Sequence, residues 1–318
     1  MKKLLVVAVA ALSVLGAASP SLAEPINQFS FQITGLKPDG RFTLIFQART
    51  FDTTGAVPPE LLSNYLRVPA GATLRKEFLN KRFYCNGPQL RDSIDRDLAG
   101  SGTPFVDRVA NLPKFIKALR KKKSARDKRD LANALTCLRA KIGTGTAQID
   151  ARATIPALDQ LVPSKFTIFF SKPTEPGAVS GFTVVGAADV ASDAPIVKKY
   201  PIVGAVHVAL SANFFNEPTP DGLYGYKLVL PDSNVNGLKV SIAELRVVNT
   251  GLTLKKGECL KTGKGGRCVK KQKKTLFWFN TPPCPASGKI SFLSHFEYVA
   301  PQPPITETVE LACPKFLP

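Results

Sequence analysis

The stretch RFTLIFQARTF, residues 41–51, shows the pattern that decides the fold. Its apolar side chains Phe42, Leu44 and Phe46 fall on alternate positions, so one face of an extended chain becomes apolar. Alternation of this kind over β-branched and aromatic residues is typical of a strand with one buried face. The same period returns at 165–171, 181–189, 201–211, 224–231, 237–248, 274–280, 289–299 and 305–313.

The apolar runs are bounded by Pro, Gly, Asn and Asp, which favour turns. The chain holds 26 Pro and 23 Gly, and 44% of its residues are hydrophobic, which is too apolar for a disordered protein. The strand–helix alternation of a parallel sheet is missing. We therefore predict a mainly β fold, an antiparallel β-sandwich compatible with a jelly-roll path, built as one large domain over residues 24–318.

Residues 88–140 depart from this pattern and carry a helical period. Phe115, Ile116 and Leu119 share one helical face, and Pro113 suits the first helical position. The period continues through Leu131, Leu135 and Leu138. We predict a basic helical insertion over 88–140.

The first 23 residues match a secretory signal peptide. Lys2 and Lys3 form a positive start, residues 4–17 form an apolar segment too short to span a membrane, and small residues lead up to Ala23. We predict cleavage after Ala23 and a secreted or cell-surface location. No later apolar run is long enough to cross a membrane, so we expect no membrane span after cleavage.

All six cysteines follow this segment, and an even number in an exported chain predicts three disulfides. They are Cys85, Cys137, Cys259, Cys268, Cys284 and Cys313. Proximity in sequence favours Cys259 with Cys268 and then Cys284 with Cys313, although other connectivities are open. A zinc site is the competing interpretation, but no C-x₂-C occurs and the chain has only two histidines.

Basic residues are concentrated in two runs. Without Lys2 and Lys3, 41 basic residues face 24 acidic ones, a net charge of +17. Residues 114–130 carry +7 of it and residues 255–274 carry +8. Charge of one sign gathered in this way attracts anionic partners more strongly than the same charge spread over a surface.

Two interpretations of the runs stay open. Exposed lysine keeps a protein soluble and blocks pairing at strand edges, or it contacts an anionic polymer or lipid headgroup of the cell envelope. Nucleic acid is a poor candidate, because the protein is expected to be exported and the runs lack interleaved stacking aromatics. The candidate polyanion-binding residues are Lys121, Lys122, Lys123, Lys270, Lys271, Lys273 and Lys274.

The glycine-lysine cluster KTGKGG, residues 261–266, is similar to a phosphate-binding loop only at first sight. Gly265 follows Lys264 where a Walker loop needs Ser or Thr to hold Mg²⁺, and the residues that follow are strand-like. We interpret the cluster as the turn of a basic hairpin closed by the nearest cysteine pair. It belongs to a C-terminal disulfide-stapled segment, 255–318.

The segment PDSNVNG, residues 231–237, matches the opening of a calcium loop. Asp232, Asn234 and Asn236 supply oxygens at alternate positions, but the place of the terminal bidentate Glu holds Ala243. A Pro-Asp turn followed by an Asn-Gly hairpin turn explains the same residues. We therefore predict a turn and no metal ligands.

The inventory for catalysis is thin, with no G-x-S-x-G and no H-E-x-x-H. His295 and Glu297 share a strand face, either as an oriented base or as an exposed contact. A glycosidase needs two carboxylates from different strands, and nothing singles out Glu217, Asp221 or Asp232. We predict no catalytic residues and no cofactor.

The order of several short motifs resembles a group of uncharacterised exported bacterial proteins with β-rich architecture. The motifs are Cys85, the run from Cys137 to Gly143-Thr-Gly145, Phe215-Asn216, Tyr224-Gly225-Tyr226-Lys227-Leu228, and the unit Cys284-Pro285…Phe296-Glu-Tyr298…Cys313. The spacing departs from the group, since residues 86–136 are longer than usual and Phe215-Asn216 falls late. The resemblance implies the pairings Cys85–Cys137 and Cys284–Cys313, and it implies no activity.

The signal peptide, the paired cysteines, the two basic runs and the thin catalytic inventory together favour one interpretation. It is an exported, non-enzymatic binding or structural protein of the cell envelope or extracellular space. It would contact anionic polymers, such as a cell-envelope polysaccharide, through its two basic runs. The alternative is a carbohydrate-active β-sandwich enzyme, either a hydrolase or a lyase.

Overall fold

The computed structural model describes residues 26–34, 43–51, 61–98, 104–152, 154–155, 157–158, 160–191, 193–230, 234–235, 238–239, 241–249, 251–262, 268–273, 275–280, 282–299 and 303–313. The expected signal peptide, 1–23, lies outside these residues.

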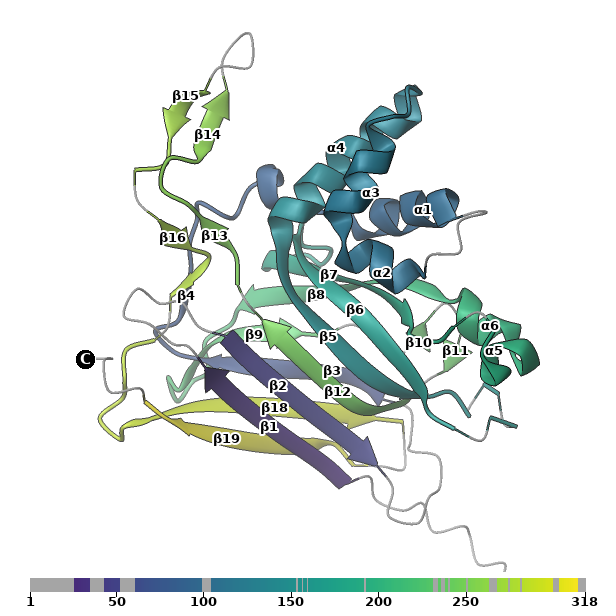
Figure 1. The fold of residues 1–318 in the computed structure, drawn as a ribbon. Coiled ribbons are helices and arrows are strands. Elements are labelled where there is room, and N and C mark those ends of the chain that lie inside the picture. The colour runs from purple at the N-terminus through teal and green to yellow at the C-terminus, as the bar shows by residue number, and fades with distance from the viewer. Residues whose placement is uncertain are drawn as a thin grey trace, which may run out of the picture.

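Eleven strands form one antiparallel sheet (Figure 1). In sheet order they are β1 (Ile26–Thr34), β2 (Thr43–Phe51), β12 (Ser241–Asn249), β5 (Lys141–Asp150), β6 (Val162–Ser171), β7 (Ala178–Ala188), β8 (His207–Asn216), β9 (Tyr224–Val229), β3 (Leu61–Pro69), β18 (Lys289–Tyr298) and β19 (Ile305–Ala312). Strands β5 to β9 are neighbours in sequence and in space, as in a meander. Strand β12 returns from far along the chain to lie between β2 and β5.

The sheet is strongly curled, so that its two edge strands, β1 and β19, approach each other. The alternation expected from the sequence is seen in β18, where Ile290, Phe292, Phe296 and Tyr298 point to the buried face. The prediction of a mainly β, antiparallel fold is confirmed. The sandwich is not confirmed, because the eleven strands follow one continuous hydrogen-bonded order. Alternating apolar residues specify a buried face, and they do not specify whether the opposing face comes from a second sheet or from the same one.

Eight short strands form four small antiparallel pairs beside the main sheet. The pairs are β4 (Thr73–Leu74) with β17 (Phe279–Asn280), β10 (Asn234–Val235) with β11 (Leu238–Lys239), β13 (Thr253–Leu254) with β16 (Leu276–Phe277), and β14 (Cys259–Thr262) with β15 (Cys268–Lys271).

Four α-helices fill the range in which the sequence shows a helical period. They are α1 (Gly87–Leu98), α2 (Phe105–Ala110), α3 (Leu112–Leu119) and α4 (Ala125–Ala140), and the short 3-10 helix η1 (Lys81–Phe83) precedes them. Two further short helices, α5 (Pro195–Lys199) and α6 (Pro201–Ala205), lie together beyond β7. Helices α1, α2 and α4 pack on β6, β7 and β8 and cover the outer face of the sheet there.

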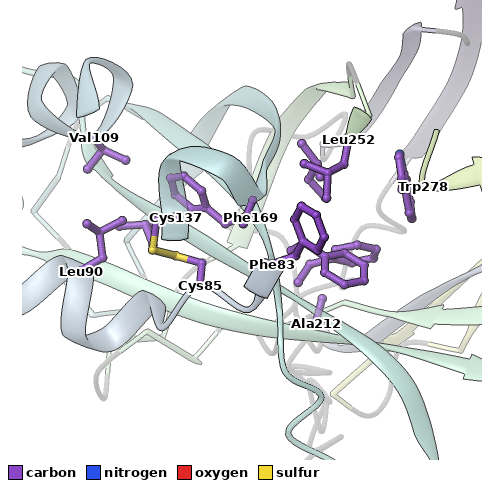
Figure 2. Packing of buried hydrophobic residues seen from close by; sticks show 14 of the residues in the cluster. Phe83, Cys85, Leu90, Val109, Cys137, Phe169, Ala212, Leu252 and Trp278 are labelled. Carbon is purple, nitrogen blue, oxygen red and sulfur yellow. A yellow bond between two sulfur atoms is a disulfide. The ribbon is translucent and has the colours of Figure 1, made fainter. Parts of the chain in front are cut away.

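The main core therefore lies on both sides of β6. Phe169 is fully buried on the side of the helices, near Cys137 and Val109 (Figure 2). The next residue, Phe170, is also fully buried and forms edge-on contacts with Phe182 and Trp278 on the other side. Burial on both faces explains why this part of β6 is continuously apolar instead of alternating.

Helix α3 buries the face that the sequence predicts, and α4 buries its predicted face in part, with Leu131 and Leu135 half-buried against the core. Phe115, Ile116 and Leu119 are buried as expected. In α4 the buried positions include Ala134 and Cys137, whereas Leu138 is 38% exposed. The disulfide from Cys85 to Cys137 and the small Ala134 side chain bring α4 close to the sheet, and this rotates the leucines toward the edge of the contact.

Candidate anion-binding face

The first basic run forms the turn between α3 and α4. Lys121, Lys122 and Lys123 follow the end of α3 and are all exposed. Ser124 caps α4, and its side chain and that of Asp127 hydrogen-bond each other's backbone N–H groups in a capping box. The turn that carries the lysines therefore has both of its helix ends defined.

Most cations of this run have no acidic partner. Lys122 forms an ion pair with Asp97 at 3.0 Å, and it is the only member of the run with one among the described residues. The hydrogen bond from Ser124, together with the charges of Lys122 and Arg96, lowers the pKa of Asp127. Asp130 is buried, forms an ion pair with Arg96 at 2.5 Å and accepts a hydrogen bond from the Gln89 side chain. The two acids of the run are thus engaged with groups outside it or in the helix cap.

The second run is carried by the β14–β15 hairpin, which the Cys259–Cys268 disulfide closes. Lys270 and Lys271 on β15 and the following Lys273 are exposed, whereas Lys274 lies outside the described residues. Gly263, Lys264 and Gly265 of the glycine-lysine cluster also lie outside them. The hairpin interpretation of the two flanking segments is confirmed.

The stem of this hairpin is fixed to the main core. Strands β13 and β16 continue from the hairpin, and Leu254, Leu276 and Trp278 are buried. Gly251 has a φ of +70°, and a Cβ there would lie 2.9 Å from the Trp278 ring nitrogen. A glycine is needed at this position, since the residue adopts a left-handed conformation directly beside the indole ring.

Helix η1 connects the two basic elements. The Arg82 guanidinium binds the Glu258 carboxylate at 2.9 Å, which joins η1 to the root of the hairpin. Three residues later, the Cys85–Cys137 disulfide joins the same segment to α4. Asn133 of α4 adds hydrogen bonds to the backbone of the adjacent residue 86. These links hold both runs to a common segment.

Figure 1 shows the hairpin and the α3–α4 turn projecting from the same end of the molecule. Lys81, the first residue of η1, and the nearby Lys76 are exposed as well. We call this end the basic face; it comprises residues 114–130, η1 with Lys76, and the described part of 255–274. The sequence indicates the two runs. It contains no signal of the ion pair between Arg82 and Glu258, through which η1 is joined to the hairpin.

The two histidines lie apart from this face and from each other. His207 Nδ1 lies 2.5 Å from an Asp95 carboxylate oxygen, and its ring stacks on Phe105. His295 Nδ1 lies 2.7 Å from the Thr306 hydroxyl. Glu297, the expected neighbour of His295, accepts a hydrogen bond from Ser63 instead. The structure gives His295 and Glu297 separate partners, which favours the surface-contact interpretation over an oriented base.

Two of the carboxylates considered for glycoside hydrolysis, Glu217 and Asp221, are engaged by neighbouring side chains. Glu217 binds Arg67 at 2.6 Å. The hydrogen bond from the Thr219 hydroxyl, with the Leu223 backbone N–H as a second donor, lowers the pKa of Asp221. A general acid of a glycosidase requires a raised pKa, so Asp221 is not suited to that role. Asp232 lies outside the described residues.

No metal site is found in the part of the chain that the structure describes. It contains no group of three or more His, Cys, Asp or Glu residues able to hold an ion. All six cysteines are paired, as Cys85–Cys137, Cys259–Cys268 and Cys284–Cys313. The three predicted disulfides are confirmed, and the zinc interpretation fails because every thiolate ligand it would need is in a disulfide.

The candidate calcium loop is described only in part. Its Asn234 and Val235 form β10, which pairs antiparallel with β11 so that Val235 faces Leu238. This pairing agrees with the hairpin interpretation. Asp232, Asn236 and Gly237 lie outside the described residues.

Comparison with family models, with curated protein sequences and with solved structures found no match to this chain. Among the helices that the structure describes, none is both long and apolar enough to cross a membrane. The function is therefore argued from the chemistry of the surface.

Proposed function

We propose that this chain is an exported, non-enzymatic binding protein that holds an anionic polymer of the cell envelope or extracellular space on its basic face. The observation that carries the proposal is the arrangement of its two basic runs. The two runs carry +15 of the net charge of residues 24–318. Every lysine of the runs that the structure describes with its burial is exposed, and both runs project from one end of the molecule (Figure 1). The rest of the chain is close to neutral.

Unpaired cations favour this proposal over simple solvation. Surface lysines that serve only solubility are usually interspersed with acids, and their fields then cancel. Here the single acid of the second run, Glu258, is bound by Arg82, and the acids of the first run face α1 or the helix cap. The remaining positive potential attracts polyanions, with an affinity that falls as salt rises.

The two basic runs do not offer what single-stranded nucleic acid requires. Stacking platforms need exposed aromatic side chains among the cations. Phe115 is the one aromatic residue in the first run and it is fully buried, and the second run contains none. An acidic polysaccharide or a phosphate polymer binds to lysines through its charge and needs no such platform.

Export supports this choice of partner. The expected signal peptide at 1–23 and three disulfides are typical of proteins that fold in an oxidising compartment. In that setting the abundant polyanions are envelope and matrix polymers. A carbohydrate-active enzyme remains the alternative, although Arg67 binds Glu217 and the pKa of Asp221 is lowered by its hydrogen bonds, the opposite of what its acid would need.

The test is retention of residues 24–318 on native envelope and on immobilised heparin as the glycopolymer probe, over 50–500 mM salt. The main variant changes Lys121, Lys122, Lys123, Lys270, Lys271, Lys273 and Lys274 to Gln. A matched pair of triple variants changes Lys121, Lys122 and Lys123, or the exposed Lys172, Lys198 and Lys199, which are not part of the face.

We expect retention to fall steeply with salt, to weaken in the first triple variant and to vanish in the seven-residue variant. The second triple variant should be retained like the unchanged protein. Equal retention of all four proteins, or retention indifferent to salt, would show that the lysines serve solvation and would refute the proposal.

A further inference from the structure

A hollow of about 440 Å³ lies between helix α2 and the outer face of β5, β6 and β12. Its size is within the range of small-molecule sites. Val106 and Val109 of α2 and Val185 and Val248 of the sheet belong to its lining. The hollow is separate from the basic face, because none of its lining residues belongs to the two runs or to η1.

Strand register places polar groups in one row across the sheet side of the hollow. Arg246 of β12 pairs with Thr146 of β5, and Thr146 pairs with Lys165 of β6. Directly paired residues share a face, and neighbouring strands lie about 4.8 Å apart. Arg246 and Lys165 therefore stand roughly 10 Å apart at the backbone, with the Thr146 hydroxyl between them.

The next row on the same face is less polar. Val248 pairs with Thr144, Thr144 with Thr167, and Thr167 with Val185. This row lies under α2, which packs on β6 and β7. The hollow thus has a cationic end and an end with valine side chains, which is the arrangement that an amphiphilic anion requires.

The two cations of the hollow, Lys165 and Arg246, differ in whether an acidic side chain already binds them. Lys165 binds Asp189 at 2.7 Å, and this contact raises the pKa of Lys165. Arg246 is exposed and has no ion-pair partner among the residues that the structure describes. Asp107 of α2 is the one acid in the lining, so it should repel an anionic ligand.

We propose that this hollow binds a small organic anion with an apolar body, such as a medium-chain carboxylate. The anionic head lies between the Arg246 guanidinium and the Thr146 hydroxyl, with Lys165 as the second cation. The apolar body lies against the valines beneath α2. Arginine suits the head because its planar guanidinium donates hydrogen bonds to both carboxylate oxygens at once.

The site is tested by calorimetric titration with sodium decanoate. The background protein carries the seven lysine-to-glutamine changes, so that binding to the basic face does not contribute. Arg246→Gln removes the free cation, Asp107→Asn removes the acid, and Thr144→Phe fills the hollow with a residue that strands accept. Lys172→Gln is the matched control, since Lys172 is exposed at the end of β6 and outside the lining.

We expect one saturable site that Arg246→Gln weakens roughly tenfold, the size of one lost charge-assisted contact. Asp107→Asn should tighten binding, Thr144→Phe should abolish it, and Lys172→Gln should leave it unchanged. Acetate, which has no apolar body, and decyltrimethylammonium, which has the opposite charge, should both fail to bind.

Circular dichroism and melting temperature establish that each variant is folded before its titration is interpreted. The proposal is overturned if decanoate shows no saturable binding, if Arg246→Gln binds as well as the background, or if decyltrimethylammonium binds equally. The last result would show an apolar surface without charge selectivity. Loss of heparin retention has no bearing on this outcome, because the two sites share no residues.

Discussion

The disulfides should differ in what they contribute to stability, and the difference can be worked out from the structure. Cys85–Cys137 closes a sequence separation of 52 residues, and Cys259–Cys268 closes one of 9. In the chain-entropy treatment, removing them lowers the free energy of unfolding by about 4 and about 2.5 kcal/mol, respectively. The gap between the two is then about 1.5 kcal/mol.

Burial should widen this gap. Cys137 is fully buried and Cys85 is 3% exposed, under α4 and against the core. Changing both to Ala leaves a small cavity where the sulfur atoms lay, which costs about 1 kcal/mol more. Cys259 and Cys268 lie in the projecting hairpin, where water fills any space. The expected difference between the two double variants is therefore about 2–3 kcal/mol.

The assay is urea unfolding of the Cys85→Ala/Cys137→Ala and Cys259→Ser/Cys268→Ser proteins. Circular dichroism reports the sheet, and fluorescence of the single tryptophan, Trp278, reports the stem of the hairpin. Both signals should change together in the unchanged protein if it unfolds in one step. Equal losses in the two variants, or a larger loss in the hairpin variant, would refute the assignment of Cys85–Cys137 as the main covalent support of the fold.

Three further predictions concern a glycine in β5, a half-buried glutamate in β19 and the length of polymer that the basic face binds. Gly145→Ala should cost about 1–3 kcal/mol in urea unfolding, because its Cβ would lie 2.1 Å from Phe166 Cζ and 2.6 Å from the Arg246 carbonyl oxygen. Gly225→Ala is the strand control, since its nearest neighbour is 3.5 Å away, and equal losses would contradict the clash. Burial raises the pKa of Glu307, so its ionisation costs stability above the unfolded pKa of about 4.3 and costs nothing well below it. Glu307→Gln should therefore raise the free energy of unfolding at pH 7 by less than about 1 kcal/mol, measured by urea unfolding, and should give no gain at pH 3. A gain of the same size at both pH values would be inconsistent with this. Finally, if both basic runs hold one polymer, long heparin should bind more than about tenfold tighter than a tetrasaccharide at equal charge concentration, and equal affinity would mean that the runs act separately.

The sequence predicts the local structure well and the long-range arrangement poorly. Alternating residues in β18 and the helical spacing of Phe115, Ile116 and Leu119 each follow from a period that local geometry imposes. The position of β12 between β2 and β5 has no such signal, because it depends on pairing with segments about 200 and about 100 residues away along the chain. The same reason explains why one curled sheet could not be told from two packed sheets.

The candidate sites divide in the same way. The basic runs are visible as composition, so their residues could be named from the sequence. The contact of Arg82 with Glu258 and the row from Arg246 to Lys165 are not visible, since each joins residues from distant segments. The hollow depends on the register of β12, β5 and β6 and on the packing of α2 against the sheet. A local sequence pattern contains neither.

The placement of the disulfides is itself an argument about the basic face. Two of the three lie at its supports, Cys85–Cys137 beneath α4 and Cys259–Cys268 across the hairpin. Lysines that only keep a protein soluble work equally well on mobile segments, because solvation does not depend on their spacing. A surface that holds a polymer gains from fixed spacing, since a preorganised site loses less conformational entropy on binding. Covalent support beneath both basic runs therefore favours recognition over solvation, and reducing the Cys259–Cys268 bond alone should weaken polymer binding although no lysine has been changed.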